Sequence, residues 1–180
     1  MAASYLKGSA KTDALTVTGA STLTGTVTAT AGIAGPALSA APVDCTASTL
    51  TITQATHAGR MVTLNRAAGI AVTLPAATGT GSVYRFLIGT TVTSNATTIK
   101  VANATDVMTG SALVISDDAA AVLGYKTAAS SDTVSFNGST TGGILGDVVE
   151  VEDVGAGLFR VTVVSSATGT EATPFSATVS

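Results

Sequence analysis

The sequence has few charged side chains. Asp, Glu, Lys and Arg make up 11% of its 180 residues, whereas a typical soluble domain carries about 25%. The hydrophobic share is 46% and the mean hydropathy is +0.50. A protein that stays free in solution covers itself with charged groups, so their scarcity indicates that much of this surface contacts protein rather than water. The composition therefore favours a protein that assembles with other subunits.

Aromatic residues and excess positive charge are missing as well. Trp is absent, Phe and Tyr together make up 4% of the chain, and the formal net charge is -3. Nucleic-acid binding depends on a basic surface, often with aromatic side chains on which bases stack. Cleavage of glycans needs paired carboxylates, and the sequence shows no such pair beside aromatic platforms for the sugar rings. We therefore expect no nucleic-acid partner and no glycan cleavage.

Cysteine and histidine occur once each, as Cys45 and His57. One thiol cannot form an internal disulfide, and zinc sites use several Cys or His ligands. Nucleophilic catalysis needs a nucleophile, a base and a group that orients the base, and no nucleophile motif surrounds either residue. We expect His57 to lie in a polar turn and Cys45 to be a small hydrophobe that is buried or at the boundary of the core. The sequence thus predicts no enzyme activity, no catalytic residue, no metal and no cofactor.

The acidic residues form one further candidate site. Glu150, Glu152 and Asp153 share a predicted strand, on which Glu150 and Glu152 face the same side, and Asp117 and Asp118 lie in a predicted turn that could begin one turn of helix. Calcium could use such oxygens, but no calcium-binding loop pattern is present. We interpret the cluster on the strand as the solvent-exposed charges of a sheet edge, where they discourage unwanted pairing.

The sequence shows no pattern of a secretory signal or a membrane span. Met1 to Lys7 lacks a basic region followed by an apolar one. The charge-free run from Ala14 to Val43 is rich in Thr, Ser and Gly and is interrupted by Pro36. We expect synthesis in the cytoplasm and no membrane partner.

Thr, Val, Ala and Gly are the most abundant residues of the sequence, and the β-branched ones among them, Thr and Val, favour strands. In residues 1–42, apolar residues alternate with Thr at period two, which predicts extended chain in short rungs. So thin a ribbon cannot bury its own apolar side chains, but three copies wound around one axis can. We therefore predict an N-terminal assembly arm, intertwined in a homotrimer. Its predicted interface residues are Leu15, Val17, Leu23, Val27 and Ile33.

Residues 43–180 carry many short alternating runs separated by turn residues, which predicts an all-β body: a β-sandwich, a jelly roll or a small barrel. The clearest hairpin joins residues 148–154 to residues 158–164 through Gly155-Ala-Gly157. The other predicted strands are residues 50–52, 61–64, 70–74, 83–88, 98–101, 113–115, 122–125 and 133–136.

Two parts of the chain look like known proteins. The Thr/Gly/Val-rich arm resembles the N-terminal segments of fibre and head-decoration proteins of tailed bacteriophages, and residues 72–86 and 136–153 look like stretches common in phage virion proteins. The resemblance implies a capsid decoration or cement protein, a homotrimer on the virion surface whose partner is the major capsid protein, made in the cytoplasm of the host bacterium. Two alternatives remain: a tail-fibre or head-fibre module that binds a host glycan, and a small enzyme that uses His57.

Overall fold

A computed structural model describes residues 41–118 and 121–179. These residues form twelve strands and one helix of four residues, α1 (Gln54–His57). The predicted all-β fold is confirmed. None of the helical structure in the described ranges is long and apolar enough to cross a membrane.

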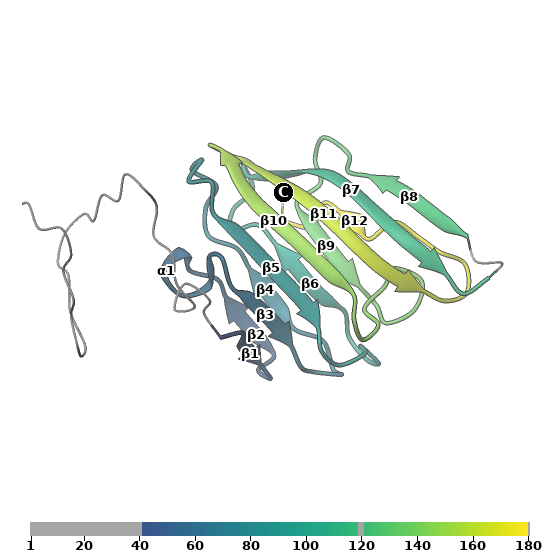
Figure 1. The fold of residues 1–180 in the computed structure, drawn as a ribbon. Helices are drawn as coiled ribbons and strands as arrows, with labels where there is room; N and C mark the ends of the chain where they lie inside the picture. The colour runs from purple at the N-terminus through teal and green to yellow at the C-terminus, as the bar shows by residue number, and fades with distance from the viewer. Residues whose placement is uncertain (1–40, 119–120, 180) are drawn as a thin grey trace, which may run out of the picture. The chain divides into compact units, whose positions relative to one another are not determined.

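The strands form two sheets that lie face to face (Figure 1). In order across the first sheet, the strands are β1 (Val43–Cys45), β3 (Met61–Leu64), β5 (Val83–Ile88), β10 (Val148–Gly155), β11 (Leu158–Ala167), β7 (Val107–Ser116) and β8 (Val122–Lys126). In order across the second sheet they are β12 (Phe175–Ser176), β9 (Thr133–Phe136), β6 (Thr97–Lys100), β4 (Ala71–Thr73) and β2 (Thr49–Thr51). Of the three predicted architectures, the body is therefore a sandwich of two open sheets.

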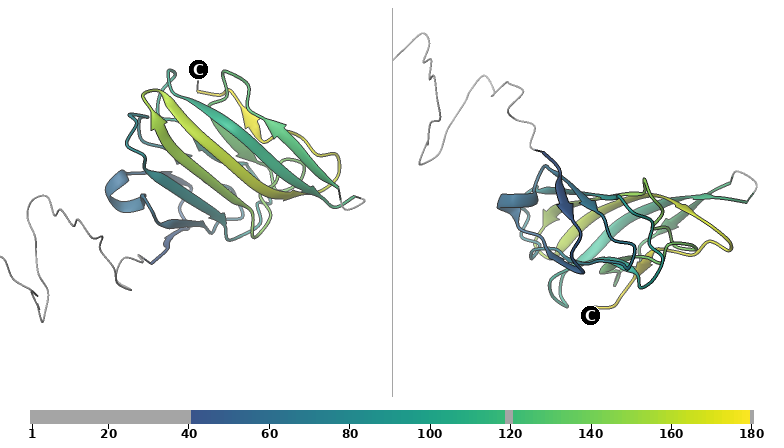
Figure 2. Two further views of the ribbon diagram at one scale, coloured as in Figure 1. Left: turned by 45° about the horizontal axis from the view of Figure 1, so that its top comes forward. Right: turned by 90° about the horizontal axis from the view of Figure 1, so that it is seen from below.

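The first six strands alternate between the two sheets. β1, β3 and β5 are parallel neighbours in the seven-stranded sheet, and β2, β4 and β6 are parallel neighbours in the five-stranded sheet. The chain from β1 to β6 is thus a flattened coil that crosses from one layer to the other after each strand, as Figure 2 shows. After β6, strands β7 to β12 add mostly antiparallel ladders, with β11 and β7 as a parallel pair.

The core lies between the sheets and takes alternate residues from each strand. Tyr84 and Phe86 on β5, Phe159 on β11 and Phe136 on β9 are its largest buried side chains. Burying one side chain of this size contributes about 1.5–3 kcal/mol. The scarce aromatic residues thus serve mainly to fill the space between the layers.

The chain bends at Gly138, two residues after the end of β9. Gly138 has a φ of 81°, and a Cβ there would lie 1.8 Å from the carbonyl oxygen of Val92. Only glycine combines this backbone conformation with so close an approach. At Gly138, therefore, the loop that follows β9 lies directly against the loop that follows β5.

Candidate functional site

The predicted interface residues Leu15, Val17, Leu23, Val27 and Ile33 lie outside the described residues. The same holds for nearly all of the predicted arm, since the description begins at Ala41. Any functional site on the described chain therefore consists of residues of the sandwich itself.

His57 and Cys45 are both buried and contact neighbouring residues of their own segments. His57 is the last residue of α1 and is buried. Its Nδ1 accepts a hydrogen bond from the backbone N–H of Thr53 at 3.0 Å and lies 3.4 Å from Oγ1 of the same residue. The ring thus bonds back to the residue that precedes the helical turn. Of the predicted polar turn around His57, residues 54–57 form α1, and the turn itself follows at Ala58 and Gly59. Cys45 is the buried hydrophobe that we expected, with its thiol 3.9 Å from the carbonyl oxygen of Ala47.

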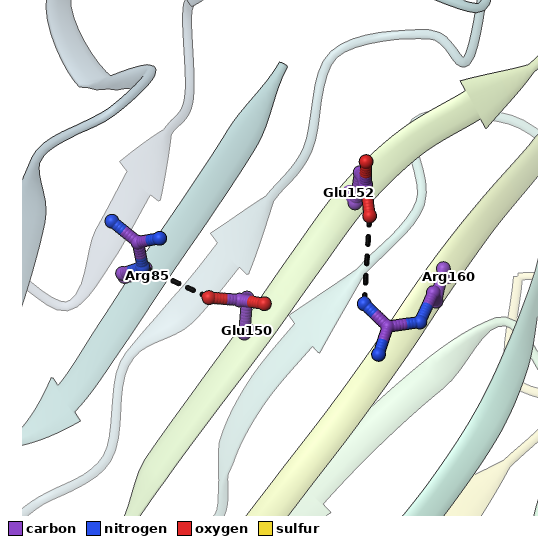
Figure 3. Close-up of polar contacts among 4 residues, drawn as sticks. All are labelled: Arg85, Glu150, Glu152 and Arg160. Carbon is purple, nitrogen blue, oxygen red and sulfur yellow. Dashed lines mark hydrogen bonds and ion pairs between the residues drawn. The ribbon is translucent and has the colours of Figure 1, made fainter. Parts of the chain in front are cut away.

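The prediction that Glu150 and Glu152 mark a sheet edge is wrong. Their strand β10 lies between β5 and β11, inside the seven-stranded sheet. The ladder places Glu150 opposite Arg85 and Glu152 opposite Arg160, and the side chains form ion pairs at 2.9 Å and 3.5 Å (Figure 3). Both Glu residues do share the outer face, as predicted. Arginines on the two neighbouring strands, and not the solvent at an edge, compensate these carboxylates.

Asp153 points the other way, into the sandwich, and is 2% exposed. Its carboxylate accepts hydrogen bonds from the backbone N–H groups of Gly79 at 2.7 Å, Thr80 at 2.9 Å and Thr78 at 3.1 Å, and from Oγ1 of Thr80 at 2.8 Å. Desolvation by burial raises the pKa of Asp153, but these hydrogen bonds together outweigh it and hold the pKa below its ordinary value. Asp153 is therefore an anion that fixes the loop between β4 and β5.

Asp147 holds a second loop in the same way. Its carboxylate accepts hydrogen bonds from the backbone N–H groups of Gly143 at 2.8 Å, Ile144 at 3.0 Å and Ser166 at 2.8 Å. Desolvation is the largest influence here and raises the pKa of Asp147 in spite of these bonds. Asp106 and Asp132 are also buried and also accept backbone N–H groups.

The sequence analysis named only Asp153 among these buried aspartates, and its interpretation of that residue as a solvent-exposed charge of a sheet edge is wrong, because the side chain is buried. It did not identify Asp106, Asp132 or Asp147. They do not combine into a metal site, since no group of three or more potential ligands lies together in residues 41–118 and 121–179. Asp117 and Asp118, the other acidic candidates, lie in the bend after β7 and not in a helix.

A hollow of about 330 Å³ lies on the outer face of the seven-stranded sheet, over β3, β5, β10 and β11. Its lining combines the apolar side chains of Met61, Val148 and Val164 with the charged groups of Arg85, Glu150 and Arg160. Most of the charge in the hollow is already compensated by the two ion pairs. The hollow therefore offers apolar surface with a polar rim, the composition of a protein contact.

Next to the hollow, four large aliphatic side chains lie exposed on the same face. They are Leu113 (50% exposed), Ile115 (46%), Val122 (61%) and Val164 (39%). Val164 is paired with Leu113, and Ile115 with Val122, so the four are neighbours across β11, β7 and β8. We call this set the apolar strip. Contiguous exposed apolar residues of this kind mark interaction surfaces.

Comparisons with known proteins give no match: no family model matches the chain, and neither do any curated proteins or solved structures. The outer face of the seven-stranded sheet, with its hollow and its apolar strip, is thus the candidate functional site on geometry alone.

Proposed function

We propose that this chain is a non-enzymatic structural protein of a bacteriophage virion, a trimeric capsid decoration or cement protein that bridges major capsid subunits. The observation that carries the proposal is the apolar strip on the outer face of the seven-stranded sheet, whose side chains no other described residue buries. It agrees with the low charge of the sequence and with the resemblance of the arm and of residues 72–86 and 136–153 to phage virion proteins.

The size of the strip explains why such a protein would act as a multimer. Its four side chains are about half exposed, and covering them contributes about 1 kcal/mol each, or about 4 kcal/mol in total. Association costs an estimated 4–15 kcal/mol or more in lost translational and rotational freedom. One such contact is therefore weak, whereas a trimer that engages three equivalent sites gains by avidity.

The surroundings of His57 and of the acidic residues first considered as a calcium site favour a structural role over an enzymatic one. The ring of His57 is bonded to Thr53 of its own helical turn, and Glu150 and Glu152 are bonded to arginines. A glycan-binding module would present aromatic faces to sugar rings, yet Phe86, the aromatic residue in the lining of the hollow, is 1% exposed. The composition of the hollow supports a protein partner.

The proposal is tested on particles assembled without this protein. We expect them to form but to release their genome at a lower temperature than complete particles, because a protein that binds only the assembled shell stabilises it by mass action. Adding back the purified protein restores heat resistance in a saturable manner and leaves host adsorption unchanged. Normal heat resistance combined with lost adsorption would identify a receptor-binding fibre instead.

A matched pair of variants tests the role of the face in the same assay. Leu113→Asp with Ile115→Asp places charge on the apolar strip, and Thr109→Asp with Ser111→Asp places the same charge on exposed positions of the same strand and face. We expect the first variant to lose protection of the particle and the second to keep it. Equal protection by both variants would exclude the strip from the contact.

A further inference from the structure

The hollow on the outer face of the seven-stranded sheet has an unequal balance of charge in its lining. Arg85 and Arg160 contribute two positive charges, and Glu150 contributes one negative charge. Glu152 pairs with Arg160 from outside the lining, and at 3.5 Å its ion pair is the longer of the two. The four charges cancel at long range, but the hollow itself retains one positive charge.

Arg160 has unused hydrogen-bond donors. A guanidinium group carries several N–H donors in one plane, and the ion pair with Glu152 uses Nη1 alone. Among the described residues, Nε and Nη2 of Arg160 have no hydrogen-bond partner. Figure 3 shows the terminal nitrogen that is not bonded to Glu152 on the far side of the guanidinium. We call Nε and Nη2 of Arg160 the free fork, because their geometry matches the two oxygens of a carboxylate.

Arg85 also keeps donors that its glutamate does not use. Its Nε donates to Glu150 at 2.9 Å, and no described residue accepts a hydrogen bond from its terminal nitrogens. The side chains of Arg85 and Arg160 are 49% and 54% exposed, so water has access to these donors. A partner that covers the hollow removes this water, and charged donors left without acceptors cost more than neutral ones. The partner must therefore bring acceptor oxygens with it.

Apolar side chains lie beside the free fork. Val148 and Val164 are directly opposite each other on β10 and β11, and both line the hollow. Along β11, Arg160, Thr162 and Val164 all face outward, so the charged and apolar parts of the hollow follow each other on one strand. Val164 also belongs to the apolar strip. A group that binds in the hollow thus meets N–H donors at one end and aliphatic surface at the other.

We propose that the hollow binds a protein partner through an Asp or Glu side chain that accepts hydrogen bonds from the free fork of Arg160, while an aliphatic side chain of the same partner packs on Val148 and Val164. A phosphate offers similar oxygens, but Glu150 and Glu152 lie beside the fork and repel the neighbouring phosphates of a nucleic acid. The adjoining apolar strip likewise requires a partner with apolar side chains, as protein contacts have.

The inference deepens the proposed function by giving the contact surface of the partner its chemistry. It rests on that function only for the identity of the partner as a capsid subunit. Charged contacts of this kind determine which partner fits more than how tightly it binds, whereas the apolar strip contributes burial. The partner that we infer therefore carries an acidic residue within an aliphatic surface.

Isotope labelling of arginine tests the free fork in the full chain. The sequence contains four arginines, Arg60, Arg66, Arg85 and Arg160, so the NMR spectrum has four Nε–H signals. Those of Arg60 and Arg66 are internal controls, because neither residue lines the hollow. The probe is acetyl-Leu-Ala-Glu-amide, whose Leu and Glu side chains lie on the same side when the peptide is extended. The matched control is acetyl-Leu-Ala-Gln-amide, which has the same shape without the charge.

We expect the Glu peptide to shift the Arg160 signal in a saturable manner and to leave the signals of Arg60 and Arg66 unchanged. The Gln peptide should bind about fivefold more weakly, because hydrogen bonds to charged groups are stronger than those between neutral groups. Equal affinities of the two peptides, or no shift of the Arg160 signal with either, would overturn the inference. Inorganic phosphate that binds as well as the Glu peptide would also overturn it, since the hollow would then take any anion.

Arg160→Lys separates the fork from its charge. Lysine keeps the positive charge but lacks the planar pair of donors, and the exposed ion pair with Glu152 contributes little to stability. In uniformly labelled protein, the backbone amide signals of Thr162 and Val164 report the affinity of each peptide. We expect Arg160→Lys to lose the preference for the Glu peptide and the control Arg66→Lys to keep it. An unchanged preference in Arg160→Lys would refute the role of the fork.

Two outcomes would place a carboxylate of this protein itself in the hollow and would overturn the inference. Residues 1–40 contain one acidic residue, Asp13. A shift of the Arg160 signal in Asp13→Asn protein would indicate the chain's own segment, and a shift on dilution of the unmodified protein alone would indicate a second copy. We expect neither shift.

Particle protection by the unmodified protein is measured separately. A preference for the Glu peptide without any protection of particles would refute the capsid role and leave the carboxylate site in place. Protection of particles combined with equal affinities of the two peptides would refute the carboxylate site alone.

Discussion

Substitution of Asp153 is the most direct test of how the sandwich holds its loops. Asp153→Asn keeps the size of the side chain but replaces an anionic acceptor by a neutral amide, one end of which is a donor. In the structure the carboxylate accepts four short bonds from residues 78–80. Hydrogen bonds to charged groups are worth about 1.5–3 kcal/mol each when buried, but the loop itself is exposed, so that water recovers part of the loss.

We therefore expect Asp153→Asn to lower the free energy of unfolding by about 2–3 kcal/mol, and Asp153→Ala by about 3–4 kcal/mol, near pH 7. Glu152→Gln is the matched control, because its carboxylate lies on the exposed face with an ion pair of 3.5 Å, and we expect it to change stability by less than about 1 kcal/mol. Denaturant unfolding followed by circular dichroism measures all three at one protein concentration, since self-association would add stability.

The pH dependence of the same experiment follows from the lowered pKa of Asp153. A carboxyl group with a lowered pKa in the folded state adds stability that is present above the unfolded pKa, about 3.9, and is lost as pH falls through the folded pKa. The difference between the unmodified protein and Asp153→Asn should thus be constant near neutrality and should shrink below about pH 4. A difference under about 0.5 kcal/mol at pH 7, or one that does not shrink in acid, would refute the assignment of Asp153 as an anionic loop anchor.

Three further predictions concern other buried groups. Asp147 has a raised pKa, so its titration adds stability that is fully present below the unfolded pKa and is lost as pH rises through the folded pKa. Unfolding free energies of the unmodified protein and of Asp147→Asn, measured from pH 3 to 7, should therefore differ most in acid, with the variant less stable. This trend is the opposite of the one expected for Asp153→Asn. Gly138→Ala forces a Cβ against the Val92 carbonyl at a positive φ and should cost more than about 2 kcal/mol in denaturant unfolding. His57→Ala and Cys45→Ala should each lose about 1 kcal/mol and leave particle protection intact, and lost protection by a folded His57→Ala protein would revive the enzymatic alternative.

The strands that the sequence predicted best are those in which one face is buried along the whole length. Residues 61–64, 83–88 and 133–136 were predicted with the bounds that the structure gives to β3, β5 and β9. Their alternating side chains determine which face is inside. Alternation does not determine which strand lies next to which, and the parallel coil from β1 to β6 could not be predicted for that reason.

Three kinds of element escaped the sequence analysis for physical reasons. β1 and β12 have three and two residues, too few to show a period. β7 extends from Val107 to Ser116, but only residues 113–115 were predicted, because Gly110 and Ser111 are typical of turns. The hairpin of β10 and β11 was predicted correctly, whereas the position of β10 within the sheet was not. In the sequence, glutamates on one face of a strand have the same pattern whether the strand is at an edge or lies between strands that carry arginines.

The sequence predicted that the protein has a surface that contacts other proteins, but not which residues form it. Low charge indicated a surface that contacts protein, but the apolar strip depends on three strands distant in sequence coming together. Leu113 and Ile115 belong to a run that the sequence presents as an ordinary strand, and nothing local distinguishes its exposed face from its buried one. The burial of the aspartates was not predicted because Asp side chains are mostly exposed, whereas here loop backbone N–H groups bond to the carboxylates.

The charges on the outer face determine what kind of attraction it can exert. Arg85 and Arg160 each lie beside a glutamate of β10, so the four charges cancel locally and leave no strong field to steer a charged partner. The neighbouring apolar strip has no charged member. Binding through this face therefore depends on apolar burial, which salt screens little. A face that binds by burial retains its partners over a wide range of ionic strength, which agrees with the proposed role as a decoration protein.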